Sequence, residues 1–440
     1  METVASQPLW RQGDFVKLWG AQTFAQIGAQ ITFVALPLTA ILVLGATPMQ
    51  MGLLTALEAL PSLLVGLHAG AVVDRRRRRP VLLWTALGRA LILAAVPLAW
   101  LAGILSIELL YAAVFFVGLL TLFFDVAYQA FLPVVVPPSR IVEANSKLEL
   151  SRTAAEVAGP GLAGWLVQVV TAPLSILGTA LTFLASALLL ARLRVAEAVS
   201  TGPVAGGRLL GEIGDGLLVV FHDPRLRAIA GSRGVLGLFN AMLEAVFVLH
   251  IARSLGLSPA LIGLVFAVGS IGFVIGSLLP SRLSVRFGLG PATIAAVALV
   301  GISDLLVSAA AGSLLVVVPL LIVAQFCFGV GFTVFNVNQA SLRQDVVPVR
   351  LQGRASATIR FLAVGLAPIG ALIGGALAEE IGLRPTLAVA AVGELGAAVW
   401  LWFSPIRSLM IMPEMVGDET VRDAGDLDAG DTASGDPGRS

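Results

Sequence analysis

The chain has 440 residues, of which 57% are hydrophobic and 12% are charged. Soluble domains carry about 25% charged residues, so this composition excludes a soluble globular protein and indicates a polytopic membrane protein. The formal net charge of +1 is uninformative, because the positions of the charges along the chain hold the information.

About 20 apolar residues, rising 1.5 Å each, cross a membrane core about 30 Å thick. By this measure the sequence predicts twelve membrane spans. They lie at 18–44, 48–72, 80–102, 107–134, 150–170, 173–193, 225–252, 258–281, 290–311, 313–340, 355–381 and 384–404. The predicted fold class is an all-α membrane protein.

The loop at 70–80, GAVVDRRRRRP, orients these spans. A single Arg or Asp at mid-membrane costs roughly 2.5–3.5 kcal/mol, so this loop stays in water. Cytoplasmic loops are enriched in Lys and Arg, and nearly all other arginines between spans fall on the same side as this loop. The prediction is a multi-pass protein of the plasma or inner membrane with both termini in the cytoplasm.

The spans divide into two halves of six. Residues 1–194 are expected to form an N-terminal six-helix bundle, 195–224 a cytoplasmic linker and 225–410 a C-terminal six-helix bundle. Within the linker, 209–221 is compatible with a short amphipathic helix on the membrane surface. The acidic, glycine-rich segment 411–440 is expected to be a disordered cytoplasmic tail.

The two halves resemble each other. Tyr128-Gln129-Ala130 recurs as Asn338-Gln339-Ala340, and Pro160 falls opposite Pro368. A repeat of six spans per half is typical of transporters built from two related bundles.

The loop motif resembles a known family, the major facilitator superfamily, whose hallmark between spans two and three is GxxxDRxGRR. Five motif residues match, and Arg77 stands where the family has a second glycine. The matching residues are Gly70, Asp74, Arg75, Arg78 and Arg79. The resemblance implies the major facilitator fold of two six-helix bundles, and a gating loop that contacts the other bundle in the outward-facing state.

A second resemblance concerns span five. The segment AGPGLAG at 158–164, with Gly159, Pro160 and Gly164, is similar to the Gly-Pro motif of the superfamily's proton-coupled exporters. Segments 123–133 and 143–152 resemble the enterobactin-exporter and macrolide-efflux branch. The Gly-Pro segment either seals the cavity against proton leak or simply packs tightly.

The resemblance implies that spans 1, 4, 7 and 10 line a central cavity. Polar residues on these spans are the candidate substrate-binding groups: Gln22, Gln26, Gln30, Tyr128, Asn240 and Asn336. The three glutamines repeat at i, i+4 and i+8 and therefore share one helix face. Hydrogen bonding between helices is the alternative use of such residues.

Two carboxylates in these spans, Asp125 and Glu244, are the candidate proton-coupling groups, because an ionisable side chain at membrane depth is a functional candidate. For Asp125, pairing with an arginine is the alternative. Glu58 and Glu156 are expected to face protein, with Glu156 pairing Arg152 one turn earlier.

Two further carboxylates and a buried arginine stand apart. Asp304 and Glu394 lie on helices that are peripheral in the family, and no transport role is expected for them. Arg89 is expected either to reach the inner interface or to neutralise a buried carboxylate.

Other chemistry is not expected. The sequence has no GxxxxGK[ST] motif, one cysteine and three isolated histidines, so we expect no enzyme activity, no cofactor and no metal site. The arginine run is too short for a nucleic-acid surface, although it can bind anionic lipid.

The sequence therefore predicts a secondary active, proton-coupled exporter (an antiporter) of amphiphilic small molecules such as antibiotics or siderophores. Its expected partners are a small-molecule substrate, protons and the lipid bilayer, and we expect a monomer. Two alternatives remain open: an importer of a small metabolite, and a non-transporting membrane receptor or lipid-translocating scaffold.

Overall fold

The computed structural model describes residues 9–195, 197, 218, 220–347 and 349–410. These residues form helices joined by short turns, and none of them is in a β-strand. The expected linker at 195–224 and its surface helix at 209–221 lie mostly outside the described residues, and the acidic tail at 411–440 lies wholly outside them.

Long helices follow the predicted spans. Those of the first half are α2 (Gly13–Leu42), α3 (Pro48–Asp74), α4 (Arg78–Leu101), α5 (Ile107–Val135), α6 (Ile141–Val170) and α7 (Ala172–Ala191). Those of the second half are α9 (Pro224–Leu249), α10 (Pro259–Leu278), α12 (Leu289–Ala309), α13 (Leu314–Val346), α14 (Val349–Ile381) and α15 (Leu383–Trp402). A π-helical turn, His250–Ser254, extends α9, and the short α11 (Pro280–Phe287) follows α10.

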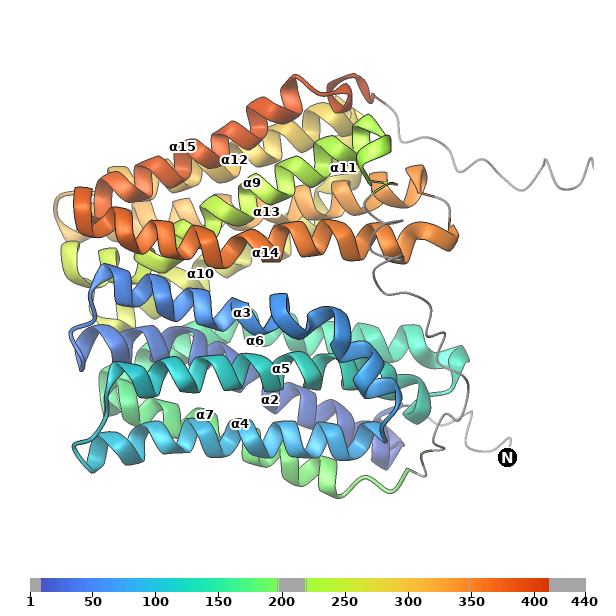
Figure 1. The fold of residues 1–440 in the computed structure, drawn as a ribbon, viewed down its shortest axis with the longest axis vertical. Coiled ribbons are helices and arrows are strands. Elements are labelled where there is room, and N and C mark those ends of the chain that lie inside the picture. Colours follow the sequence, from blue (N-terminus) through green and yellow to red (C-terminus); the bar gives the residue numbers. More distant parts are fainter. Residues whose placement is uncertain (1–8, 196, 198–217, 219, 348, 411–440) are drawn as a thin grey trace, which may run out of the picture.

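Among the described residues, 11 helices are long and apolar enough to cross a membrane. The remaining predicted span corresponds to α6, which has 30 residues. Arg152, Glu156 and Gln168 lower its hydropathy, which explains why it is not among the 11. Even so, α6 runs alongside the other helices and packs against α2 and α10 (Figure 1).

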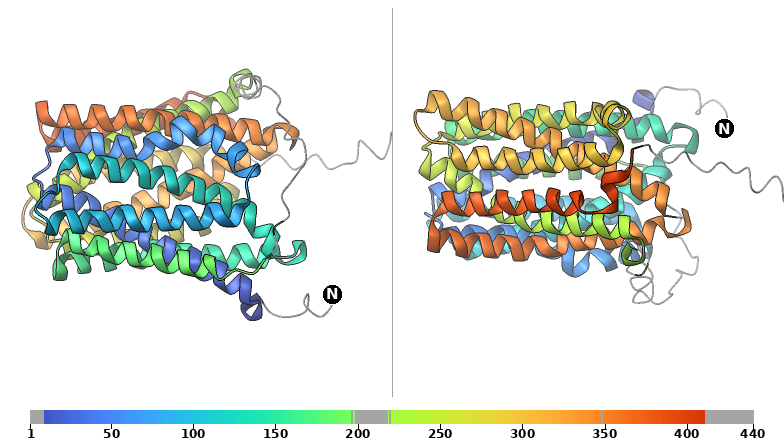
Figure 2. Two further views of the ribbon diagram at one scale, coloured as in Figure 1. Left: turned by 60° about the horizontal axis from the view of Figure 1, so that its bottom comes forward. Right: turned by 90° about the horizontal axis from the view of Figure 1, so that it is seen from above.

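The helices of the first half lie together, as do those of the second half (Figures 1 and 2). We call the contact surface between the two groups the bundle interface. It is formed mainly by α3 against α14 and by α6 against α10, with further contacts of α9 with α3 and α2. Helices α4 and α7 lie on one outer side of the molecule, and α12 and α15 on the other (Figure 1).

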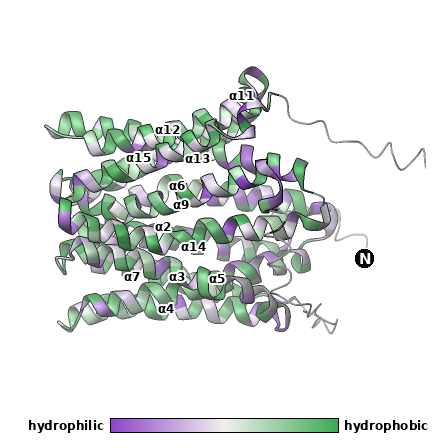
Figure 3. Ribbon diagram, turned by 45° about the horizontal axis from the view of Figure 1, so that its top comes forward, coloured by the Kyte–Doolittle hydropathy of each residue, from purple (hydrophilic) through white to green (hydrophobic). Residues whose placement is uncertain are grey.

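The two ends of the helices differ in charge. One end, which we call the arginine-rich end, holds Arg75, Arg76, Arg77, Arg78, Arg79, Arg140, Arg192, Arg286 and Arg407. Figure 3 shows hydrophilic residues gathered at this end, where α11 lies. At the other end, which we call the opposite end, lie the turns at 43–47, 102–106, 255–258, 310–313 and 382.

Local sequence signals explain where several helices begin. Thr47, Ser258 and Asp223 each cap a helix whose next residue is proline, which suits the first helical turn. The Asp223 carboxylate accepts hydrogen bonds from the Arg225 and Leu226 backbone N–H groups at 2.7 and 3.4 Å. Partial burial raises the pKa of Asp223, but its bonds to Arg225 outweigh burial, and the pKa is lowered.

Candidate functional site

Two carboxylates meet at the bundle interface. On α9, Glu244 is exposed while every other residue from 241 to 250 is buried, so its side chain projects from an otherwise buried stretch of the helix. Glu58 is exposed in the middle of α3, the helix that packs against α9 across the interface. The two acids are close enough for the charge of Glu58 to act on Glu244. The structure therefore places Glu58, which was expected to face protein, beside the candidate coupling residue Glu244.

A third carboxylate lies on α5. Asp125 and Gln129 are one turn apart, and both are exposed, which makes this a water-accessible face of α5. The charges that act on Asp125 come from Arg89 of α4 and from Arg360 of α14. Arg360 is exposed and belongs to the other bundle, so Asp125 and Arg360 carry opposite charges on the two sides of the bundle interface.

Arg89 is held by aromatic rings. Only 2% of its surface is exposed, and its guanidinium lies 4.2 Å from the centroid of Phe124 and 4.3 Å from that of Phe183. Its Nη1 donates to the Thr121 hydroxyl at 3.4 Å. The cation–π contacts of Arg89 with the two rings are worth about 2 kcal/mol when desolvated. Arg89 thus lies behind Asp125 and joins α4, α5 and α7.

The three glutamines of α2 are all half-buried. Gln30 packs against Gly159 of α6, where a Cβ would overlap the glutamine side chain. The Gln22 side-chain oxygen is buried without a hydrogen-bond partner among the described atoms. Further along the same helix, Phe33 is 40% exposed. The stripe therefore combines an unpaired amide with contacts to α6.

Two other predicted cavity residues have protein partners. Tyr128 is only 8% exposed and stacks on Phe124, with ring centroids 6.2 Å apart. Asn336 accepts a hydrogen bond of 2.6 Å from Nη1 of Arg233 on α9. Asn240 is half-buried on α9, and its side chain lies next to Glu394 of α15. The structure thus exposes Asp125 and Glu244 and leaves the α2 stripe half-buried, whereas Tyr128 and Asn336 contact protein.

Glycines bring the two bundles into close contact near the opposite end. A Cβ on Gly164 of α6 would lie 2.7 Å from the Cα of Gly263 on α10. A Cβ on Gly52 of α3 would lie 3.0 Å from the Cα of Gly375 on α14. The backbones approach this closely only because side chains are absent. The Gly-Pro segment of α6 thus forms one of two equivalent helix crossings between the bundles.

Polar and aromatic contacts reinforce closure at this end. Nη2 of Arg253 donates to the Ile41 carbonyl at 3.5 Å, and the Met49 backbone N–H donates to Glu379 at 3.2 Å. Both hydrogen bonds join one bundle to the other. The Phe266 ring of α10 lies 5.5 Å from Phe33 of α2 and 5.5 Å from Phe247 of α9, edge to face.

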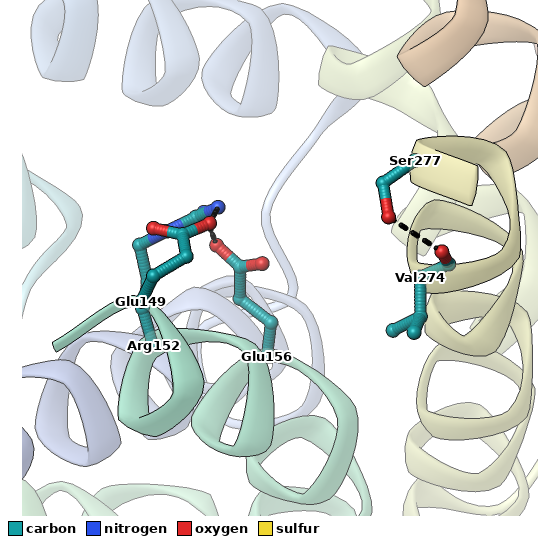
Figure 4. Close-up of polar contacts among 5 residues, drawn as sticks. All are labelled: Glu149, Arg152, Glu156, Val274 and Ser277. Carbon is teal, nitrogen blue, oxygen red and sulfur yellow. Dashed lines mark hydrogen bonds and ion pairs between the residues drawn. The ribbon is translucent and has the colours of Figure 1, made fainter. Parts of the chain in front are cut away.

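Toward the arginine-rich end, glycines of the facing helices α3 and α14 lack such close contacts. Gly66 and Gly70 of α3 and Gly353 of α14 have space around them, because a Cβ at each would meet nothing within 4 Å. On α6, Arg152 pairs with both Glu149 and Glu156 rather than with the facing helix α10 (Figure 4). The expected pairing of Glu156 with Arg152 is confirmed.

Arg78 and Arg79 of the motif loop contact their own bundle. The Glu197 carboxylate accepts the backbone N–H groups of Arg78 and Arg79 at 2.7 and 3.2 Å, and thereby caps the start of α4. The Arg79 side chain donates to the Leu190 and Ala191 carbonyls at 3.3 and 2.7 Å, at the end of α7. These contacts fasten α4 to α7 and to the start of the linker.

Three functional candidates have no clear signal in the sequence. Glu58 and Arg360 become candidates because the fold places them at the bundle interface. Arg233 becomes one because it binds the predicted cavity residue Asn336. The usable signal was weak: each is a charged residue inside an apolar span, and the direction in which it points depends on tertiary packing. Among the described residues, no group of three or more His, Cys, Asp or Glu side chains could hold a metal ion.

Comparison with known proteins agrees with this geometry. The sequence model of a family described as transmembrane secretion effectors matches residues 4–415. A multidrug efflux pump, Tap of Mycolicibacterium fortuitum, is 27% identical over 385 residues, covering 86% of this chain and 92% of that protein.

Solved structures share the fold. A point mutant of the nucleoside transporter NupG superposes with a TM-score of 0.72 at 14% identity, over 88% of this chain and 98% of that one. A bacterial homologue of the iron transporter ferroportin, in an inward-facing state, gives a TM-score of 0.69 at 19% identity, over 90% of this chain and 98% of that one.

Proposed function

Because this chain belongs to the transmembrane secretion effector family of the major facilitator superfamily, and is therefore a multi-pass membrane transporter, we propose that it exports amphiphilic small molecules in exchange for protons. The proposal goes beyond the family in three respects: the direction of transport, the coupling ion and the class of substrate.

The observation that carries the proposal is the pair Glu58 and Glu244. Two acids at mid-helix, accessible to water and placed on different bundles, repel each other when both are ionised. A proton or a cationic substrate relieves that repulsion. Competition between the two for one acidic site is the simplest basis for exchange, because binding of one requires release of the other.

Alternating access supplies the movement. The bundles are in close contact at the opposite end, and the arginine-rich end is open. With the arginine-rich end in the cytoplasm, as the positive-inside rule favours, this arrangement is open to the inside. Rocking the bundles would separate Gly52 from Gly375 and bring Gly66 and Gly70 toward α14. This movement gives the motif loop, which contains Gly70, Asp74 and Arg75, its proposed gating role.

The lining favours an amphiphile over a sugar. Phe33 is partly exposed beside the Phe266 ring, and the acids and the α2 amides supply the few polar contacts that orient a ligand in an apolar site. The similarity to a protein named as a multidrug efflux pump supports the same class.

The test is proton movement in liposomes that contain purified protein and a trapped pH-sensitive dye, under an imposed pH gradient. Ethidium, a macrolide and a siderophore are added one at a time, with protein-free liposomes as the control. Proton movement stimulated by at least one compound is the expected result. No stimulation by any of them, with folded protein, would favour the importer or the non-transporting alternative.

A further inference from the structure

A second pair of carboxyl groups is buried inside the C-terminal bundle. Asp304 of α12 is 3% exposed and Glu394 of α15 is 0% exposed. The two helices pack together, with Leu395 against Gly301, and the two carboxyl groups are within hydrogen-bonding reach of each other. No transport role was expected for either residue, because their helices are peripheral in the superfamily that the sequence resembles.

Three of their four carboxyl oxygens make no hydrogen bond among the described atoms. Oδ2 of Asp304 and both side-chain oxygens of Glu394 are buried without a hydrogen-bond partner among the described atoms. A carboxylate accepts hydrogen bonds but cannot donate one, so two ionised carboxylates cannot satisfy each other. One proton shared between them removes a charge and supplies the missing donor.

No described cation forms an ion pair with either acid. The half of α13 that lies nearer the opposite end carries no charged residue. Several charged groups on the neighbouring elements have other hydrogen-bond partners: Arg384 binds the Ser308 and Ala309 carbonyls, Arg233 binds Asn336, and Glu379 accepts from the Met49 backbone. His250 is buried near Arg384. The remaining ones are exposed (Glu244, Arg360 and Glu380) or lie at the arginine-rich end (Arg343 and Asp345). A proton is therefore the ligand that fits this pair.

Asn240 connects the pair to the bundle interface. Its side chain lies next to the Glu394 carboxyl. Gly393 packs directly on the Phe239 ring, which brings this part of α15 onto α9. Asn240 is half-buried and precedes Glu244 by one helical turn. The order Asp304, Glu394, Asn240 and Glu244 thus leads from the interior of the C-terminal bundle to the accessible acid.

We propose that Asp304 and Glu394 share one proton and exchange it with the bundle interface past Asn240, so that the pair is a second proton-binding site behind Glu244. A role of this second site in transport rests on the proton coupling proposed above. Binding of a proton by the pair does not depend on that proposal.

Infrared difference spectroscopy on protein in liposomes tests occupancy. At neutral pH, we expect a C=O stretch of a protonated carboxyl group that shifts in D2O. Each single variant, Asp304→Asn and Glu394→Gln, should displace this band, and the double variant should lose it. Ser303→Ala, which alters a buried hydroxyl that donates to the Leu299 carbonyl, is the matched control and should leave the band unchanged. If the double variant is unfolded, the single variants still decide the question through the band shift.

Exchange is tested by stepping the pH on either side of the membrane and by ethidium-driven proton flux. We expect the band to respond to pH, and Asn240→Leu to slow that response at least tenfold. Three results would overturn the proposal: no protonated-carboxyl band, a band that ignores pH, or a band that responds to Na+ at constant pH. Absence of ethidium-driven flux with a pH-responsive band would instead count against the proposed transport function.

Discussion

Glu244 of α9 and Glu58 of α3 are exposed acids on facing helices of different bundles, and each lies in the middle of an otherwise apolar segment. The charge of one acts on the other. Their separation depends on how the bundles are placed, so a movement of the bundles changes the repulsion between them. In the proposed mechanism, this dependence links the protonation of the pair to the conformation of the protein.

The first prediction concerns this pair. Glu244→Gln keeps the size of the side chain and removes the exchangeable proton, so it should abolish ethidium-stimulated proton movement in liposomes. Glu58→Gln should weaken that movement and alter its pH profile, because it removes the repulsion without removing Glu244. Glu380→Gln, an exposed acid at the end of α14, is the matched control. Wild-type proton movement in Glu244→Gln would remove Glu244 from the coupling mechanism.

The second prediction concerns the glycine crossing of α6 and α10. Gly164→Leu inserts a side chain where a Cβ alone would already overlap the backbone of α10, so closure of the opposite end should fail. Overpacking of this kind costs about 1–3 kcal/mol, which shifts a two-state equilibrium roughly 5- to 150-fold. Gly396→Leu, at a site with nothing within 4 Å of an added Cβ, should have no such effect.

The measurement is labelling of Phe33→Cys, introduced into a Cys327→Ser background, by a membrane-impermeant thiol reagent. We expect Gly164→Leu to increase the labelling rate when the reagent is added on the side of the membrane where the opposite end lies. Gly396→Leu should leave this rate unchanged. Equal rates in the two variants would mean that the crossing is ordinary helix packing.

The third prediction concerns Asp125 and Arg360, two exposed residues of opposite charge on different bundles. The charge of Arg360 acts on Asp125, and the two do not form an ion pair in this arrangement. Closure of the arginine-rich end should bring them together. Asp125→Asn and Arg360→Gln should each slow transport, and the double variant should be no slower than the worse single one. A coupling energy of about 0.5–3 kcal/mol in a double-mutant cycle is expected for residues in contact. Strict additivity of the two effects would show that the residues act independently.

Apolar length was sufficient to predict the helical spans, because each span must satisfy its own backbone hydrogen bonds in lipid. The arrangement of the spans in two bundles came from the internal repeat and from the resemblance to the major facilitator superfamily. The sites were harder to predict. Tyr128 and Gln129 are adjacent polar residues of one span, but Tyr128 is buried on Phe124 while Gln129 is exposed. Glu244 and Glu58 are likewise both acids inside apolar spans. Which of these side chains is buried depends on the helix face that meets a neighbour. Asp304 and Glu394 are 90 positions apart and meet only because α12 packs on α15. Neither fact can be obtained from spacing within one helix.

The last prediction concerns backbone strain at Thr171, in the turn between α6 and α7. Its φ is 106° and its ψ is 158°, a region that is essentially restricted to glycine and costs about 1–3 kcal/mol for other residues. The equivalent turn between α14 and α15 has Gly382 with φ 90° and ψ 163°, so the two halves share one backbone conformation and only the second has the residue that suits it. Thr171→Gly should therefore stabilise the protein by about 1 kcal/mol after the added entropy of the unfolded chain is counted.

The apparent melting temperature of detergent-solubilised protein measures this stabilisation, with Thr171→Ala, which keeps the strain, as the control. Gly382→Thr should lower the melting temperature. A lower melting temperature for Thr171→Gly would show that the threonine side chain stabilises the turn by more than the strain costs.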